Sequence, residues 1–248
     1  GVVGDGTTNN RLTPYLSLTG VIDVDVASDY GGAAGVYWAS ALAVKSDFTI
    51  RAIGKNNYGQ LGDGTTTDRP AWVTPAITNV KRVFTRNGTS YFWFNDNTVK
   101  CCGRNSQGET GNGNTTSPQT ALVTPAGAFQ GSVAGIVVLP TSASSMYSTW
   151  GLFTTAGDMW AVGYNGHGQI GDGSITQKSL WQKIGLPVGE TVVGIAGCGQ
   201  GGAGAFAMLC ASGRLFFTGY NSGGTFGCNN NLSYNNAIVR PVEPDYPM

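Results

Sequence analysis

The chain has 248 residues, a formal net charge of zero and only 11% charged residues. Its 41% hydrophobic content is enough to bury a core, which excludes a disordered chain. The basic residues are scattered, so no nucleic-acid partner is expected, and no apolar run approaches the roughly 18 residues of a membrane span, so no membrane insertion is expected either.

Short apolar segments separated by turn residues follow one another along the chain. They form four predicted sets of strands, at about 20–75, 80–125, 133–185 and 191–241, after one extra strand at about 11–16. In the second set we expect strands at 80–84, 91–94, 98–102 and 121–123. Several of these runs are continuously apolar, as in strands that are buried on both faces. No amphipathic helix of useful length is visible, so the sequence predicts an all-β fold.

An internal repeat is the strongest signal in the sequence. The motif Gly-Lys-Asn-Asn-Tyr-Gly-Gln-Leu-Gly-Asp-Gly at 54–64 returns at 103–113, at 163–173 and, degraded, at 219–229. Its starts are 49, 60 and 56 residues apart, and the chain opens near residue 1 inside a half-copy that matches 59–66. This period suits the four-stranded blades of a β-propeller. We therefore predict one propeller domain over 1–248, with about four complete blades and the extra N-terminal strand.

Four blades are too few for a large ring. Seven blades at this period need roughly 400 residues. The sequence therefore predicts that one copy does not close a seven-bladed ring. Either the ring has fewer blades, or further sequence or another chain, such as a second copy, covers the open strand edges.

The conserved spacing within the motif indicates a tight structural turn. Its glycines are expected to supply positive φ or close backbone approach, and its asparagine to bond local backbone groups. A turn is a simpler explanation of these positions than a binding site. The residues that we assign to this framework are Gly54, Asn56, Gly59, Gly62, Gly103, Asn105, Gly108, Gly163, Asn165, Gly168 and Gly171.

The motif resembles the regulator-of-chromosome-condensation repeat, in which Gly-x-Asn-x-x-Gly-Gln-Leu-Gly-Asp-Gly is followed by a Pro/Val segment, here Pro70-Ala71-Trp72-Val73. The resemblance covers nearly the whole chain and implies a propeller, usually of seven blades, with binding loops on its faces. The family usually has Trp before the first motif Gly and a Gly-x-x-His in its inner-strand region. This sequence lacks both, so it resembles a divergent branch, and the exchange factor's functional residues are not carried over.

Catalytic chemistry finds little support. The single histidine, His167, lies between two glycines, where a side chain is usually exposed and mobile, so a His-dependent triad is disfavoured. Asp23 and Asp25 point to one face of a strand, where such a pair is commonly solvated. We find no phosphate-binding loop and predict no enzyme activity and no cofactor.

Metal binding is disfavoured as well. Calcium at 63–68 would need more oxygen ligands, and Asp63 is replaced by Asn112 in the next copy, so no metal site is predicted. The odd number of cysteines does not make a disulfide framework, and we interpret them as buried free thiols. Trp72 and Trp181 occupy equivalent places after the motif and are predicted to pack between blades in preference to binding a sugar. Trp38, Trp93, Trp150 and Trp160 are assigned to the core.

Variation inside the fixed motif marks candidate binding residues. The residues at the two positions between the motif Asn and the next Gly change from copy to copy. The change reflects either contacts tuned to a ligand or sequence drift that the loop tolerates. From them we select Asn57, Tyr58, Ser106, Gln107, His167 and Ser222 as candidate contacts. Tyr58 and His167 are the strongest, because amphipathic rings supply contact area at low entropy cost. The longer excursions at 141–149 and 199–204 are further candidate loops.

These features favour a recognition module that presents loops to a protein or glycan. Low charge and richness in Asn, Thr, Gly and Ser favour an extracellular or virion-borne component, such as a phage tail-fibre or receptor-binding protein. Similar repeats occur in secreted bacterial proteins, including an inhibitor of β-lactamases, so an inhibitor or other protein-binding propeller is the alternative. An intracellular exchange factor or scaffold is the third reading.

Overall fold

The computed structural model describes residues 6–7, 9, 12–13, 16–30, 37–126, 132–139, 147–200, 203–221 and 235–239, some strand-end side chains excepted. This part of the chain contains sixteen β-strands in four four-stranded antiparallel sheets and no helix, so it has no helix that could span a membrane. Each sheet is a simple meander in which consecutive strands are neighbours. The prediction of an all-β protein with four blades is confirmed.

The blades follow the repeat closely. The first contains β1 (Val21–Tyr30), β2 (Tyr37–Lys45), β3 (Ile50–Gly54) and β4 (Arg69–Val73). The second contains β5 (Val80–Arg86), β6 (Thr89–Phe94), β7 (Val99–Gly103) and β8 (Gln119–Val123). The third contains β9 (Val133–Leu139), β10 (Thr149–Thr154), β11 (Met159–Gly163) and β12 (Lys178–Lys183). The fourth contains β13 (Val192–Gln200), β14 (Ala203–Cys210), β15 (Leu215–Gly219) and β16 (Asn235–Val239). The extra strand predicted near 11–16 falls largely outside the described residues.

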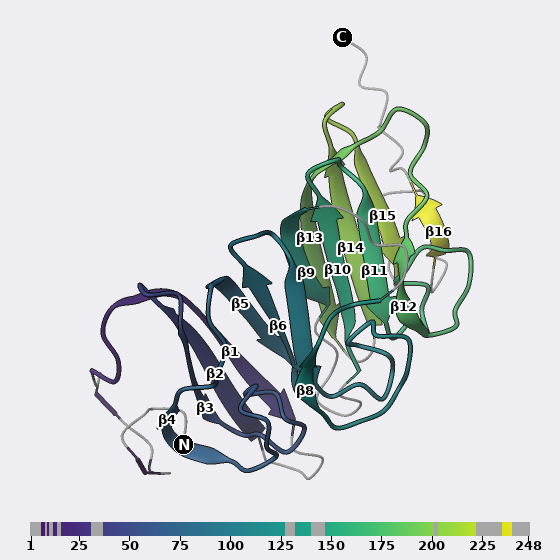
Figure 1. Cartoon of the computed structure of the whole chain (residues 1–248). Coiled ribbons are helices and arrows are strands. Elements are labelled where there is room, and N and C mark those ends of the chain that lie inside the picture. The colour runs from purple at the N-terminus through teal and green to yellow at the C-terminus, as the bar shows by residue number, and fades with distance from the viewer. Residues whose placement is uncertain are drawn as a thin grey trace.

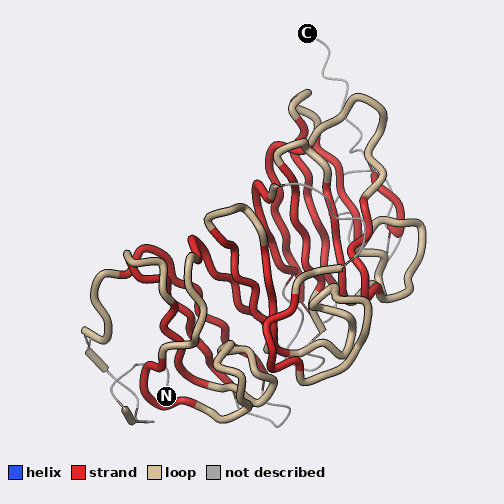
Figure 2. Tube along the Cα trace, in the orientation of Figure 1, coloured by secondary structure: helices blue, strands red, loops and turns tan. Residues whose placement is uncertain are grey.

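The four blades stand side by side in chain order, with the first and fourth at opposite ends of the row (Figure 1). At two of the three junctions the first strands of neighbouring sheets pack against each other, β1 against β5 and β9 against β13. Figure 2 shows the strands of each blade joined by turns and loops at its two ends. The outer faces of the two end blades carry apolar side chains that are about half exposed. They are Ile22, Val24 and Val26 on β1 and Val193, Leu209 and Leu215 on the fourth blade.

Three hydrophobic clusters, one at each junction, hold the blades together. The first joins Leu42 and Ile50 to Val80 and Phe92, and the third joins Met159 to residues of the fourth blade. The middle cluster is the most aromatic, because it contains Tyr91, Trp93, Trp150, Trp160 and Trp181. Tyr91 and Trp150 have ring centroids 4.4 Å apart. Because successive side chains of a strand point to opposite faces of the sheet, each blade packs against its neighbours with side chains of both faces.

The tryptophan predictions hold for four of the five tryptophans whose side chains are described. Trp93, Trp150, Trp160 and Trp181 are buried, and Trp181 packs between the second and third blades as expected. Trp72 differs, because it is only partly buried and its Nε1 donates a hydrogen bond of 2.6 Å to Ser17 Oγ. The side chain of Trp38 lies outside the described part.

The cysteine interpretation holds for the three cysteines whose side chains are described. Cys101, Cys102 and Cys210 are buried free thiols. The side chains of Cys198 and Cys228 lie outside the described part.

Asp23 and Asp25 correct one expectation from the sequence. They do share a face of β1, but they are not simply solvated. Asp23 Oδ2 accepts the backbone N–H of Val83, and Asp25 Oδ2 accepts that of Thr85, both at 2.8 Å. Asp25 also pairs with Arg86 at 3.0 Å. The two carboxylates thus take the place of backbone acceptors beside β5, because the first strands of neighbouring blades do not hydrogen-bond as a sheet.

Candidate binding face at the motif-loop end

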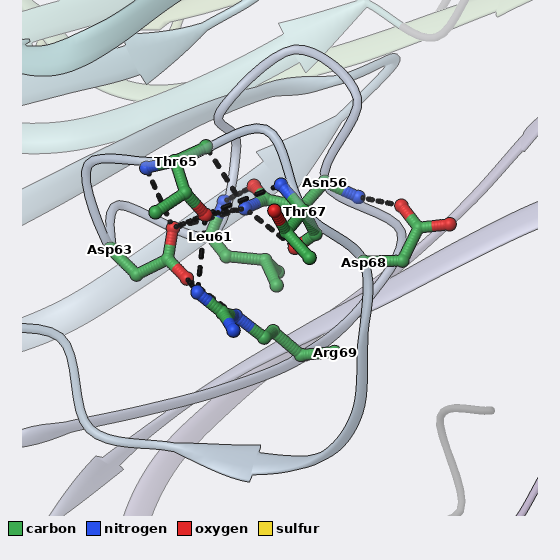
Figure 3. A network of polar contacts seen from close by, with 7 residues as sticks. All are labelled: Asn56, Leu61, Asp63, Thr65, Thr67, Asp68 and Arg69. Atoms are coloured by element: carbon green, nitrogen blue, oxygen red, sulfur yellow. Dashed lines mark hydrogen bonds and ion pairs between the residues drawn. The ribbon is translucent and has the colours of Figure 1, made fainter.

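Each of the first three repeat motifs, at 54–64, 103–113 and 163–173, forms the loop between the third and fourth strands of its blade, and most of the fourth copy lies outside the described residues. In the first loop, Asn56 is fully buried at the centre (Figure 3). Its Nδ2 donates to Asp63 Oδ1, Thr65 O and Thr67 O at 3.0–3.1 Å, and its Oδ1 accepts the N–H of Leu61 at 2.9 Å. One side chain therefore satisfies backbone groups on both sides of the loop, which explains why asparagine returns at this place.

The other loops repeat this arrangement. Asn105 and Asn165 are also fully buried, and their Oδ1 atoms accept N–H bonds from Thr110 and Ile170 at 2.8–2.9 Å. Asn165 Nδ2 reaches two backbone carbonyls at 3.1 Å. The motif glycines assigned to the framework, Gly54, Gly59, Gly62, Gly103, Gly108, Gly163, Gly168 and Gly171, all have positive φ. The framework residues thus shape the loop by their buried hydrogen bonds and their backbone conformation.

The acidic residues of the first loop serve the loop itself. Asp63 accepts bonds from Thr65 and, at 2.7 Å, from Arg69 Nε, while Asp68 pairs with Lys55 at 2.7 Å. Burial opposes ionisation of Asp63, but the hydrogen bonds from Thr65, Arg69 and Asn56 outweigh it and hold its pKa below the usual range. Nitrogen and hydroxyl donors thus occupy the oxygens that a calcium ion would need.

The meander topology brings the candidate loops together. In a four-stranded meander, the connection between the first and second strands and the connection between the third and fourth lie at the same end of the blade. The motif loops therefore share one end of the propeller with the strand ends that flank the predicted excursions at 141–149 and 199–204, of which 141–146 and 201–202 lie outside the described residues. We call this the motif-loop end. The opposite end carries the turns after β2, β6, β10 and β14.

Aromatic side chains form a continuous row along the motif-loop end. We define the aromatic row as Tyr58, Tyr147, Tyr164, His167 and Tyr220, with Arg104 between the first two. The Arg104 guanidinium carbon lies 5.9 Å from the Tyr58 ring centroid and 5.2 Å from that of Tyr147. All five rings are half-buried, so each is packed on one side and open on another.

The row continues across the third and fourth blades. Tyr147 stacks on Tyr164 with centroids 5.0 Å apart, and His167 meets Tyr164 and Tyr220 edge-on at 6.3 and 5.1 Å. The row therefore begins in the motif of the first blade and reaches the residue after β15 in the fourth. No single blade contains it.

The structure places the six sequence candidates unequally. Tyr58 and His167 both belong to the aromatic row. Asn57 Oδ1 and Ser106 Oγ are covered by the protein and have no hydrogen-bond partner in the described part. Gln107 is half-buried and its backbone N–H donates to Glu109 at 2.7 Å. Ser222 lies outside the described residues.

His167 differs from the exposed and mobile side chain that its two flanking glycines predicted. It is half-buried, because it packs edge-on against the rings of Tyr164 and Tyr220. This burial lowers the pKa of His167 below its usual value, so the ring is neutral at neutral pH.

Sequence reasoning missed half of the row. Arg104, Tyr164 and Tyr220 all follow the first glycine of their motif, a position that holds Lys55 in the first copy. This position also varies within the fixed framework, so the same comparison of copies could have found it. Tyr147 falls in the predicted 141–149 excursion but had no individual signal.

Arg104 is tied to a buried acid. Glu109 stands where the first and third motifs have Gln60 and Gln169, and its side chain is fully buried 3.7 Å from Arg104. Its Oε2 accepts the Gln107 N–H as the glutamines accept theirs. Burial raises the pKa of Glu109 above the usual value, against the attraction of Arg104.

We expect Glu109→Gln to raise stability at neutral pH. When the pKa of a carboxyl group is higher in the folded state than in the unfolded state, the folded protein loses stability as the pH rises from the unfolded-state pKa through the folded-state pKa. The variant lacks that loss but keeps the bond to Gln107, so its advantage should be present at pH 7 and absent at pH 4. Urea unfolding of both proteins at the two pH values measures this. A lower midpoint for the variant at pH 7 would show that the Arg104 pair outweighs burial.

The four meander sheets and their loops have the arrangement of β-propeller blades. Among solved structures, human WBSCR16 superposes with a TM-score of 0.68 and 18% identity over 91% of this chain and 55% of its own. Prp20p from Saccharomyces cerevisiae gives 0.65 and 13% identity, over 83% of this chain and 49% of its own. Prp20 from a complex with Kap60 gives 0.63 and 13% identity, over 83% and 47%.

At such identities the likeness concerns the fold, and the chain spans about half the length of these proteins. Comparison of the sequence with family models and with curated proteins finds no match.

Proposed function

We propose that this chain is a non-enzymatic recognition module that binds a protein or glycan through its motif-loop end. The aromatic row carries the proposal. It joins half-buried rings from several blades into one surface, and aromatic residues dominate binding energy at recognition surfaces. The framework below it is fixed by buried asparagines and glycines, so the rings stand on a rigid support.

The related propellers support binding as the general role. The yeast structures concern Prp20p and its binding to Gsp1p and histones, and Prp20 together with Kap60. The present chain has a formal net charge of zero and few charged residues, which supports a role outside chromatin. We further propose that it belongs to an extracellular or virion-borne protein, such as a tail fibre or receptor-binding component; its low charge and its richness in Asn, Thr, Gly and Ser support this.

The test uses fluorescently labelled chain on intact bacterial cells of several strains. We expect the chain to bind some strains, and the Tyr58→Ala and His167→Ala variants to lose at least about tenfold in affinity together, as for two hot-spot rings. Phe48→Ala is the matched control, because Phe48 is an exposed aromatic residue in the turn after β2, at the opposite end.

Two results would contradict the proposal. Binding to no strain would contradict a cell-surface recognition role. If Phe48→Ala lost binding while Tyr58→Ala and His167→Ala bound like the parent, the binding site would lie at the end opposite the motif loops.

A further inference from the structure

We infer that the aromatic row takes a neutral oligosaccharide, held by tyrosine hydroxyls and ring surfaces across several blades. This inference rests on the proposed function and names the class of ligand that the motif-loop end recognises.

Unpaired hydroxyl groups line the row. The four tyrosines, Tyr58, Tyr147, Tyr164 and Tyr220, are all half-buried, and within the described part of the chain none of their hydroxyls makes a hydrogen bond. Tyr164 extends over Gly166, where any larger residue would collide with its hydroxyl. Each phenol can donate and accept. A ligand that is itself rich in hydroxyl groups matches such a series along its whole length.

The charges of the row select against ionic ligands. Its one cation, Arg104, already lies between the rings of Tyr58 and Tyr147 and within 3.7 Å of Glu109. A cationic ligand would meet this positive charge at the rings that would otherwise attract it. An anionic ligand would find no free counter-charge in the row, because Glu109 neutralises Arg104 and His167 is neutral. A neutral ligand avoids both the repulsion by Arg104 and the lack of a counter-charge.

The shape of the row favours a chain over a compact ligand. Successive ring contacts of 5.0–6.3 Å carry it from Tyr147 through Tyr164 and His167 to Tyr220. Because Tyr147 and Tyr164 stack on each other and His167 meets its neighbours edge-on, the row presents ring edges and hydroxyl groups at repeated intervals, which consecutive sugar units can contact in turn. A partner protein would gain most from a compact central cluster of anchors surrounded by a rim, which an extended row does not provide.

The experiment applies the purified chain to immobilised oligosaccharides of three kinds: neutral, acidic (sialylated or uronate-containing) and basic (amino sugars without acetyl groups). We expect retention on neutral chains of several units. Tyr164→Phe and Tyr220→Phe should each weaken it about fivefold, the loss of one hydrogen bond of about 1 kcal/mol, because the rings stay in place. Tyr164→Ala should weaken it further, and Phe48→Ala should leave it unchanged.

The outcomes separate this inference from the proposed function. Retention on acidic or basic chains equal to that on neutral ones, or Tyr→Phe variants that bind like the parent, would overturn the inference. A second arm repeats the cell-binding assay after periodate oxidation of surface glycans or after proteinase treatment. Binding that survives periodate but not proteinase would contradict a glycan ligand and would remain consistent with the proposed recognition module, whose ligand would then be a protein. No binding to cells or to any oligosaccharide would overturn both.

Discussion

Replacing Gly163 with alanine is expected to cost at least about 4 kcal/mol of stability or to prevent folding. Gly163 has a φ of 103°, and a Cβ there would overlap the carbonyl oxygen of Ser148. That carbonyl also accepts the N–H of Tyr164 at 3.0 Å, so it cannot retreat without losing the bond. Gly103 and Gly219 meet Gly88 and Gly204 in the same way, which makes this close approach a feature of the blade.

Gly173→Ala in the same motif is the matched control. Gly173 also has a positive φ, of 83°, but a Cβ there would meet nothing within 4 Å. Only the backbone strain remains, so its cost should be about 1 kcal/mol. Urea unfolding followed by circular dichroism measures both variants. Equal losses would show that the conformation of Gly163, and not the contact with Ser148, demands glycine.

Asn56→Ala is expected to cost about 3 kcal/mol, because it removes the centre of the first motif loop. The substitution leaves the Leu61 N–H and the carbonyls of Thr65 and Thr67 without their partner. It also removes a donor to Asp63, which then keeps its bonds to Thr65 and Arg69 only. Buried groups that lose a partner pay their full desolvation cost, since water does not replace the missing bond.

Its neighbour provides the comparison. Asn57 has the same side chain one residue further on, but its Oδ1 has no hydrogen-bond partner in the described part. Asn57→Ala should therefore change stability by less than about 0.5 kcal/mol. Denaturant unfolding of the two variants at one pH distinguishes the roles. If both cost the same, the buried network of Asn56 contributes no more than an ordinary loop contact.

The blade architecture was accessible from the sequence because it is repeated and local. The strands alternate with turns at a period close to 55 residues, and each sheet pairs strands that are consecutive in the chain. The second blade shows this well, with strands at 80–86, 89–94, 99–103 and 119–123. The motif turn was accessible for the same reason. Its asparagine bonds groups within about ten residues, and its glycines adopt conformations that other residues avoid.

The aromatic row, our proposed binding face, and the junctions between blades were decided by the tertiary structure. Asp25 reaches the N–H of Thr85 across 60 residues of sequence, and no periodicity of β1 alone distinguishes that contact from exposure to solvent. His167 became half-buried because Tyr220, in the next blade, stands beside it. Contacts of this kind depend on how neighbouring blades pack and rotate against each other. The sequence by itself determined the blades and their loops, and only the packing of blade on blade brought Tyr58, Arg104, Tyr147 and Tyr220 into one row.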